Sequence, residues 1–313
     1  MKKKTKYILG GGLAFIILVA IVVAYLSYLL LYAPNFTQTK DVYIYIDQQT
    51  DFEKLTQQLV DSAGCKNQST FLLLAKLLDY PENIRTGKYL VEPGSGNILL
   101  LNKLRRGYQE PVKLTFNNIR LKKDLAIRLS EQLMLTEDDL LTRWNDPTYC
   151  DSLGFDTITI STLFIPNTYE VYWNISADAL MKRMLNEYTQ FWTAERREKA
   201  SQINLSLIEV AILASIVEEE SSKRDEYARV AGLYINRLMR GMPLQADPTV
   251  KFAVGDFTLR RILYRHLEVD SPYNTYMHAG LPPGPLRVPS PASLNAVLNY
   301  EKHNYLYMTA KED

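Results

Sequence analysis

The chain has 313 residues, and its 36 basic side chains nearly balance its 35 acidic ones. This balance argues against a nucleic-acid-binding protein, in which a basic excess is typical. The histidines His266, His278 and His303 are scattered, and nothing has the spacing of metal ligands, so we expect no metal site. Cys65 and Cys150 could pair in an oxidising compartment, although two isolated cysteines establish no disulfide framework.

The N-terminus is basic and leads into a long apolar run. Residues 1–7 contain several lysines, and residues 8–31 carry no charged side chain. The run is long enough to span a bilayer and exceeds the apolar region of an ordinary signal peptide, which is the alternative interpretation. Because lysines favour the cytoplasmic side, we expect a cytoplasmic tail at residues 1–7, a single-pass transmembrane helix at residues 8–31 in the cell membrane, and an extracytoplasmic body.

A small module is expected beyond a linker at residues 32–40. Residues 41–107 predict a strand, two amphipathic helices, a second strand and a third helix, in that order. The strands are expected at residues 42–46 and 87–91. Such a unit suits a compact binding module, and a simple spacer is the alternative.

Residues 108–313 mix strands and helices, so the whole chain is predicted to be α+β. Patterns favour a strand over residues 112–116 and helices over residues 121–133, 179–192 and 226–240. The intervening segment that contains Asn167 and Tyr169 is rich in aromatic, amide and hydroxyl groups. Such groups suit sugar rings, although the edge of a core strand is the favoured interpretation when the segment is taken alone.

One helix between Ser206 and Glu220 is expected to organise the chemistry. Ser206 and Glu209 form a capping-box pattern, and residues 207–217 are apolar on nearly every face, as in a buried helix. Glu218, Glu219 and Glu220 then arrive at its C-terminal end, where the helix dipole disfavours negative charge.

The three glutamates occupy different helical faces. Glu218 lies above the small residues Ala211, Ala214 and Ser215, whereas Glu220 lies above bulky ones. A carboxyl group over a shallow strip of small side chains would have room for a ligand, and partial desolvation would favour its protonated form as a general acid. A solvated acidic helix end is the alternative interpretation.

Two polar segments follow this helix, at residues 244–249 and 271–276. They are rich in Tyr, Asn, Gln and Thr and are stiffened by proline. Loops of this composition suit a preorganised polar cleft, although the same residues also simply make turns.

Several segments occur in an order and spacing that resemble one family. The matching segments are residues 164–169, 214–220, 235–238, 244–249, 273–276 and 280–284. The resemblance is to endolytic murein transglycosylases, the MltG or YceG-like family, and it also covers the N-terminal anchor. It implies that residues 41–107 are a LysM-like subdomain and that residues 108–313 are a transglycosylase catalytic domain.

The resemblance implies that the chain cuts peptidoglycan glycan strands internally, with Glu218 as the catalytic glutamate. In that reaction a carboxyl group protonates the glycosidic oxygen after N-acetylmuramic acid, and the sugar's own C6 hydroxyl attacks C1 to give a 1,6-anhydro end. One glutamate can act first as acid and then as base. No metal or cofactor is consumed, and peptidoglycan synthases are expected partners.

Further site residues follow from the same motifs. Glu220 is expected either to favour the protonated form of Glu218 by like-charge repulsion or to form an ion pair with Arg224 or Arg229. Ala246 stands where the family is expected to carry a hydroxyl residue. The residues expected to contact substrate are Gln245, Asp247, Thr249, Tyr273, Asn274, Thr275, Asn167 and Tyr169.

Two other functions stay open at this point. A muramidase would use Glu218 together with Asp247 or Glu220, because a glycoside hydrolase usually needs two carboxyl groups. A non-catalytic peptidoglycan-binding scaffold would bind glycan strands without cutting them.

Overall fold

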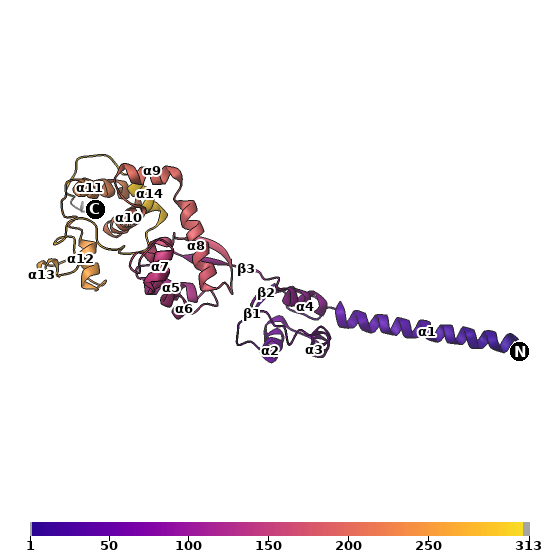
Figure 1. Ribbon diagram of the computed structural model, residues 1–313. Helices are drawn as coiled ribbons and strands as arrows, with labels where there is room; N and C mark the ends of the chain where they lie inside the picture. Colours follow the sequence, from indigo (N-terminus) through magenta and orange to yellow (C-terminus); the bar gives the residue numbers. More distant parts are fainter. Residues whose placement is uncertain (1, 309–313) are drawn as a thin grey trace. The chain divides into compact units, whose positions relative to one another are not determined.

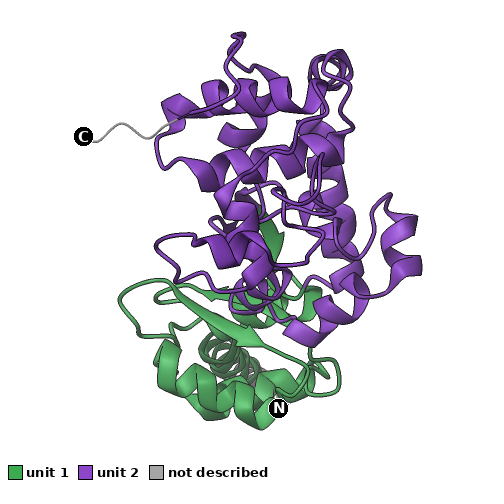
Figure 2. Cartoon of the chain, turned by 90° about the vertical axis from the view of Figure 1, so that its left-hand side faces the viewer, with its two compact units in different colours: residues 1–112, 170–174 green, residues 113–169, 175–313 purple. Residues whose placement is uncertain are grey.

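The computed structural model describes residues 2–308, with side chains described from residue 11 onward. The fold is α+β, as predicted, and it divides into two compact units (Figures 1 and 2). Unit 1 comprises Met1–Val112 and Glu170–Asn174, and unit 2 comprises Lys113–Tyr169 and Ile175–Asp313. The side chains of the predicted cytoplasmic tail lie outside the described residues.

Unit 1 follows the predicted order of elements. The strands β1 and β2 pair antiparallel, with Val42 opposite Val91 and Ile46 opposite Gly87. Alternate residues of both strands, such as Ile44 and Tyr89, are buried in one apolar core with the helices that cross them. The elements are α1 (Lys2–Leu31), β1 (Val42–Ile46), α2 (Phe52–Ala63), α3 (Gln68–Leu77), β2 (Gly87–Val91) and α4 (Asn97–Arg106).

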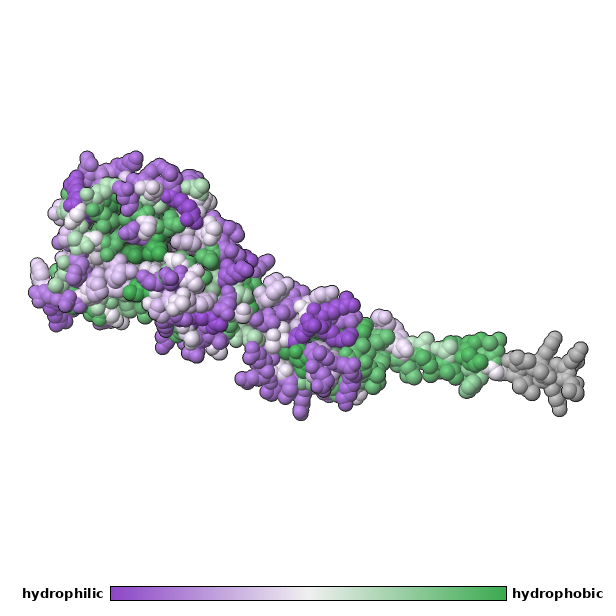
Figure 3. Space-filling model, in the orientation of Figure 1, coloured by the Kyte–Doolittle hydropathy of each residue, from purple (hydrophilic) through white to green (hydrophobic). Residues whose placement is uncertain are grey.

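From residue 11 to residue 29 the first helix is mainly apolar and exposed (Figure 3). Its segment Gly11–Leu31 is long and apolar enough to cross a membrane. At about 1.5 Å per residue, 21 residues of helix span about 30 Å, the thickness of a hydrocarbon core. This agrees with a single-pass membrane protein.

Unit 2 is built mainly from helices around α10. The strands β3 and β4 form a two-stranded sheet. The remaining elements are β3 (Pro111–Phe116), α5 (Lys122–Ser130), α6 (Glu137–Trp144), α7 (Pro147–Ser152), η1 (Ile160–Leu163), β4 (Asn167–Tyr172), α8 (Ala177–Phe191), α9 (Ala194–Gln202), α10 (Leu207–Glu220), η2 (Arg224–Glu226), α11 (Tyr227–Met239), α12 (Asp247–Val254), α13 (Tyr264–Leu267) and α14 (Pro291–Leu298).

The central helix α10 has the predicted cap and burial. The Glu209 N–H donates to the Ser206 hydroxyl at 3.2 Å, and the Ser206 N–H donates to the Glu209 carboxylate at 2.7 Å, which completes the capping box. Residues 210–217 are all buried. Helices α9, α11, α12 and α14 pack around it, so α10 ends inside unit 2 rather than in open solvent.

Some predicted boundaries were wrong. The helix expected over residues 121–133 ends at Ser130, and the segment expected as a polar loop over residues 244–249 turns into α12 at Asp247. Pro248 stands in the first turn of α12, where a missing N–H costs no helical hydrogen bond. Cys65 and Cys150 are free thiols.

Candidate active site

Glu218 is held at the N-terminus of α14. Its Oε2 accepts the Ser290 backbone N–H at 2.7 Å and the Ser293 hydroxyl at 2.8 Å. The unpaired N–H groups and dipole of a helix N-terminus favour a nearby carboxylate. The Glu218 side chain is 13% exposed, so its carboxyl group is fixed in position and still partly open to solvent.

Arg287 lies between Glu218 and Glu219. Its Nε is 3.7 Å from Glu218 Oε1, and its Nη1 donates to Glu219 Oε1 at 3.0 Å. The Arg287 Nε is buried and has no hydrogen-bond partner within the described residues. The Nη2 group donates to the Asn118 side-chain oxygen. Arg287 therefore links the first two glutamates and keeps one donor unused beside Glu218.

Arg120 completes an alternating row of charges. Its Nη2 donates to both carboxylate oxygens of Glu219, at 2.9 and 2.7 Å. Its guanidinium also lies over the Phe257 ring, 4.5 Å from the centroid. Glu219 is thus engaged by two arginines at both of its oxygens. Glu218, by contrast, keeps one oxygen, Oε1, that accepts no hydrogen bond from the described residues.

The small residues below Glu218 are covered by protein, contrary to the expectation that they leave room for a ligand. Ala211, Ala214 and Ser215 are buried, and the Ser215 hydroxyl accepts the Leu286 N–H at 2.9 Å. The small side chains instead let α14 and the segment before it approach α10 closely. The Val288 N–H donates to the Ile119 carbonyl at 2.9 Å, which sets Arg287 beside Asn118 and Arg120.

Tyr227 of α11 borders the same site. Its side chain is 5% exposed. Burial raises the pKa of the Tyr227 hydroxyl, and the Glu218 carboxylate raises that pKa further. Tyr227 therefore stays a neutral hydroxyl in the field of Glu218.

Glu220 belongs to a separate group of carboxyl and phenol side chains. Its Oε2 accepts the Tyr234 hydroxyl at 3.0 Å, and Asp247 Oδ1 accepts the Tyr276 hydroxyl at 2.6 Å. Within the described residues, Glu220 forms no ion pair with Arg224 or Arg229, which was one of the two expected roles, and Arg229 instead pairs with Glu301 at 3.2 Å. Burial raises the pKa of the Glu220 carboxyl, the Tyr234 hydrogen bond opposes this, and Asp247 adds to it.

Three of the residues expected to contact substrate are fully buried. Asn274 is 0% exposed, Thr275 1% and Thr249 0%. The Thr249 and Thr275 hydroxyls bond each other at 2.7 Å, and Thr275 also accepts the Ala246 N–H. The Asn274 amide donates to the Leu267 and Val269 carbonyls. The two threonines join the predicted polar segments to each other, and Asn274 fixes the second segment to the backbone before it. None of the three side chains forms the surface of these segments.

Three other predicted residues reach the surface of the same segments. Gln245 and Asp247 are exposed, and Tyr273 is half-buried. The backbone of Gln245 has φ 49°, and Arg237 Nη1 donates to its side-chain oxygen at 3.2 Å. Tyr273 packs on Phe252, with ring centroids 4.6 Å apart. These residues remain available for binding.

Of the two residues of β4 that were expected to contact substrate, one is likewise exposed and the other is buried. Asn167 is exposed, and its side-chain oxygen accepts the Thr168 N–H at 2.8 Å. Tyr169 is 4% exposed, its hydroxyl donates to the Ile165 carbonyl, and its ring stacks on Phe116. The alternative interpretation, a core strand, therefore applies to Tyr169.

Residues 44–313 match the YceG-like family. The chain belongs to the YceG-like family. This confirms the family resemblance seen in the sequence motifs, and the residues around Glu218 all lie inside the matching stretch.

Named relatives and a solved structure agree with this membership. The YceG-like chain is 30% identical to an endolytic murein transglycosylase of Bacillus subtilis, over 60% of this chain and 56% of that protein. It is 26% identical to an endolytic murein transglycosylase of Streptococcus pneumoniae serotype 2, over 87% of this chain and 54% of that protein. The chain thus spans about half the length of the curated relatives it matches. A YceG-like protein of Listeria monocytogenes has a crystal structure that matches with a TM-score of 0.57 and 27% identity, over 87% of this chain and 94% of that chain.

The buried threonine pair of this YceG-like chain gives a stability prediction. Thr249→Val should lower the free energy of unfolding by about 1–3 kcal/mol, because it removes a hydroxyl that donates to the Ala246 carbonyl and bonds Thr275. Urea denaturation followed by circular dichroism measures the loss. Thr189→Val is the matched control, since the exposed Thr189 hydroxyl only donates to Leu185 within α8. An equal loss in both variants would contradict the structural role of Thr249.

Glu220 gives a pH prediction. Its folded pKa is raised, so the unfolded chain, with a carboxyl pKa near 4.5, ionises at lower pH than the folded chain. The Glu220 contribution to stability is therefore lost as pH rises above 4.5, until the folded carboxyl has also ionised. Relative to Glu220→Gln, which keeps an acceptor for Tyr234, wild type should lose unfolding free energy over this range. A constant difference across urea titrations at several pH values would rule this out.

The sequence motifs did not identify the partners of Glu218. Arg287 stands in a short segment bounded by Pro285 and Pro289, and Ser290 begins a Ser-Pro helix start, a pattern typical of a cap. Both signals concern local structure and carry no information about a distant carboxylate. Arg120 carries no comparable signal.

Within residues 2–308, no cluster of three His, Cys, Asp or Glu side chains has the arrangement of a metal site.

Proposed function

We propose that this YceG-like chain is an endolytic peptidoglycan lytic transglycosylase. It cleaves the bond from N-acetylmuramic acid to N-acetylglucosamine within nascent glycan strands and leaves a 1,6-anhydro end, which terminates or trims the strand. The names of two relatives support this assignment. The structural observation that carries it is the carboxyl group of Glu218, which α14 and Arg287 fix in position while its Oε1 accepts no hydrogen bond from the described residues.

Glu218 acts through Oε1 in this proposal. Ser290 and Ser293 occupy Oε2, so the proton donated to the glycosidic oxygen is carried by Oε1. The same oxygen then accepts the proton of the C6 hydroxyl as that hydroxyl attacks C1. Arg287 Nε, which has no hydrogen-bond partner among the described residues, stabilises the carboxylate between the two proton transfers.

Substrate binding is assigned to the exposed part of the predicted set. Gln245, Asp247 and Tyr273 contact the glycan, and Asn167 provides a further polar contact. Thr249, Asn274 and Thr275 shape the two segments from below, and Tyr169 supports β4. Glu220 acts behind this surface through Tyr234.

The reaction takes place at the outer face of the cell membrane. Residues 8–31 anchor the chain with a cytoplasmic N-terminus, residues 41–107 are a LysM-like subdomain that binds glycan, and residues 108–313 are catalytic. A membrane-anchored glycan cutter of this kind works beside peptidoglycan synthases. The exposed apolar α1 supports the anchor.

A hydrolase that uses Glu218 together with Asp247 or Glu220 is the second candidate, because the chain offers these further carboxyl groups and Asp247 lies close enough to raise the pKa of Glu220. Mass spectrometry of glycan fragments separates the two reactions. Purified peptidoglycan is incubated with the whole chain in detergent, and we expect fragments one water lighter than hydrolytic ones. Reducing ends formed with water would instead identify a hydrolase, and binding without any fragments would identify a scaffold.

A further inference from the structure

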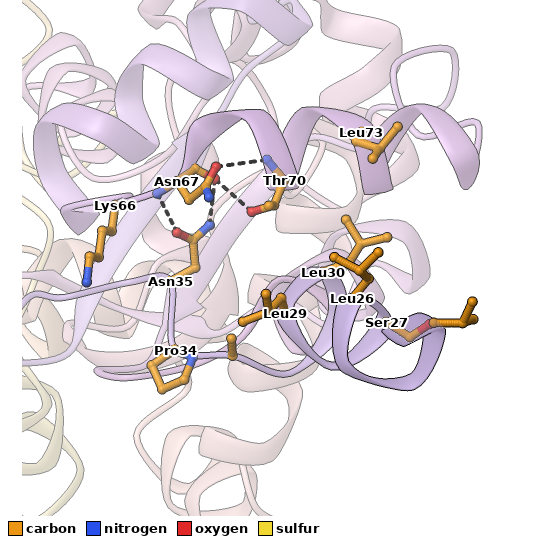
Figure 4. Close-up of a pocket in the computed structure, with 12 residues that line it drawn as sticks. Leu26, Ser27, Leu29, Leu30, Pro34, Asn35, Lys66, Asn67, Thr70 and Leu73 are labelled. Carbon is orange, nitrogen blue, oxygen red and sulfur yellow. Dashed lines mark hydrogen bonds between the residues drawn. The ribbon is translucent and has the colours of Figure 1, made fainter. Parts of the chain in front are cut away.

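Unit 1 contains a cavity of about 720 Å³ where α1 meets α3. One wall consists of the last turns of α1, including Leu26 and Leu30, and the opposite wall carries Leu73 of α3 (Figure 4). Asn35, Asn67 and Thr70 line the end near the linker, and Lys66 lies at the same end. The cavity is therefore apolar along α1 and polar where α1 ends.

Hydrogen bonds hold the polar end in shape. The Asn35 amide donates to the Asn67 carbonyl at 3.0 Å, and its side-chain oxygen accepts the Asn67 N–H at 2.6 Å (Figure 4). The Asn97 amide donates to the Thr70 hydroxyl at 3.0 Å and to the Leu30 carbonyl at 2.9 Å. The Asn97 side chain thus ties the last turn of α1 to the rest of unit 1, and the cavity is preformed.

The position of the cavity along α1 gives it access to lipid. The apolar segment of α1 ends at Leu31, so Leu26 and Leu30 belong to the last turns before the chain leaves the hydrocarbon core. The side chain of Leu73 is 53% exposed and faces these turns. In water this apolar surface is unfavourable, whereas at the rim of a bilayer an acyl chain covers it.

Lys66 places a positive charge at the polar end of the cavity. Its side chain is exposed, and within the described residues it forms no ion pair. An ammonium at the headgroup level beside neutral amides complements one negative charge. We propose that the cavity binds one anionic phospholipid of the leaflet at which α1 ends, with an acyl chain along Leu26, Leu30 and Leu73 and the phosphate at Lys66. This rests on the proposed membrane anchor and is independent of the glycan reaction.

The whole chain in lipid vesicles provides the test. Phosphatidylglycerol or phosphatidylcholine with a photoactivatable acyl chain is cross-linked, and the labelled peptides are mapped. We expect labelling within residues 23–34 and 66–73, with a preference for phosphatidylglycerol. Lys66→Ser should lower that preference about fivefold, whereas Lys76→Ser, on an exposed lysine of α3 outside the cavity, should not change it.

Two leucine variants of α3 distinguish binding in the cavity from general adsorption to the membrane surface. Leu73 lines the cavity, and Leu77 is 65% exposed one turn later but does not line it. Leu73→Ser should lower labelling about tenfold, and Leu77→Ser should leave it near wild type. Circular dichroism confirms that each variant is folded.

Three results would overturn the proposal. Equal losses in Leu73→Ser and Leu77→Ser would mean that α3 merely adsorbs to the surface. If both lipids label the chain equally and Lys66→Ser changes nothing, the cavity does not select an anionic headgroup. Cross-links between two copies of α1 without lipid labelling would mean that a second chain covers the cavity. Alkaline extraction of the vesicles shows separately whether the chain is inserted, so failure of the anchor is distinguished from failure of the lipid site.

Discussion

Glu218→Gln is expected to lower the rate of glycan cleavage by about 10²- to 10⁴-fold, which is the range of general acid–base catalysis. Glutamine keeps an oxygen that accepts from Ser290 and Ser293, so the contacts with α14 persist, but it cannot deliver a proton from the position of Oε1. The rate is measured from the fragments released from purified peptidoglycan, and glycan binding is measured by co-sedimentation.

The control for this variant lies on the same helix. Glu209→Gln changes a carboxyl group at the other end of α10, and a glutamine there still completes a capping box. It should cleave at the wild-type rate. Near-normal cleavage by Glu218→Gln would remove Glu218 from the mechanism, and loss of sedimentation together with cleavage would show that the substitution acts on binding.

Arg287→Met is expected to reduce both stability and activity. The substitution leaves Glu218 and Glu219 beside each other without the guanidinium between them, and their side chains are only 13% and 14% exposed. Removing one partner of a buried ionic group costs about 3–5 kcal/mol. Glu218 would also shift from its position, and a misplaced catalytic group can cost about 10²-fold in rate. Urea denaturation and fragment release measure the two effects.

A double-mutant cycle isolates the charge contribution. Glu219→Gln combined with Arg287→Met removes the repulsion that Arg287→Met creates, so the double variant should be more stable than the sum of the single losses predicts, by about 1–3 kcal/mol. Arg143→Met serves as the control, because the Arg143–Asp178 pair is more exposed, at 31% and 63%, and should contribute at most about 1 kcal/mol. Strict additivity in the cycle would show that Arg287 acts through packing and not through charge.

The fold could be predicted where local patterns determine it. Ser206 and Glu209 predicted the start of α10, and the all-round apolar pattern predicted its burial. Alternation predicted β1 and β2 with the observed bounds. These signals depend on residues within one or two turns of each other, which is the range over which helical and strand periodicity carries information.

The partners of Glu218 could not be predicted, because they are distant in sequence. Arg120 and Glu219 are separated by 99 positions, and Glu218 and Ser293 by 75. The sequence also did not reveal which polar side chains are buried. Thr249 and Thr275 have the residue types of a binding surface, yet the same hydroxyls satisfy buried backbone groups equally well. Composition alone does not distinguish these uses.

The row formed by Glu218, Arg287, Glu219 and Arg120 alternates two carboxyl groups with two guanidinium groups, so its net charge is small whether or not Glu218 carries a proton, and this has a consequence for the range of the electric field. Opposite charges a few ångströms apart cancel at larger distances, and dissolved salt screens what remains within about 10 Å. The site therefore exerts little long-range attraction on a glycan strand. Under the proposed function, recognition of the strand would depend on contacts made once it has arrived, and an anchor at α1 would make its arrival depend on diffusion along the membrane surface.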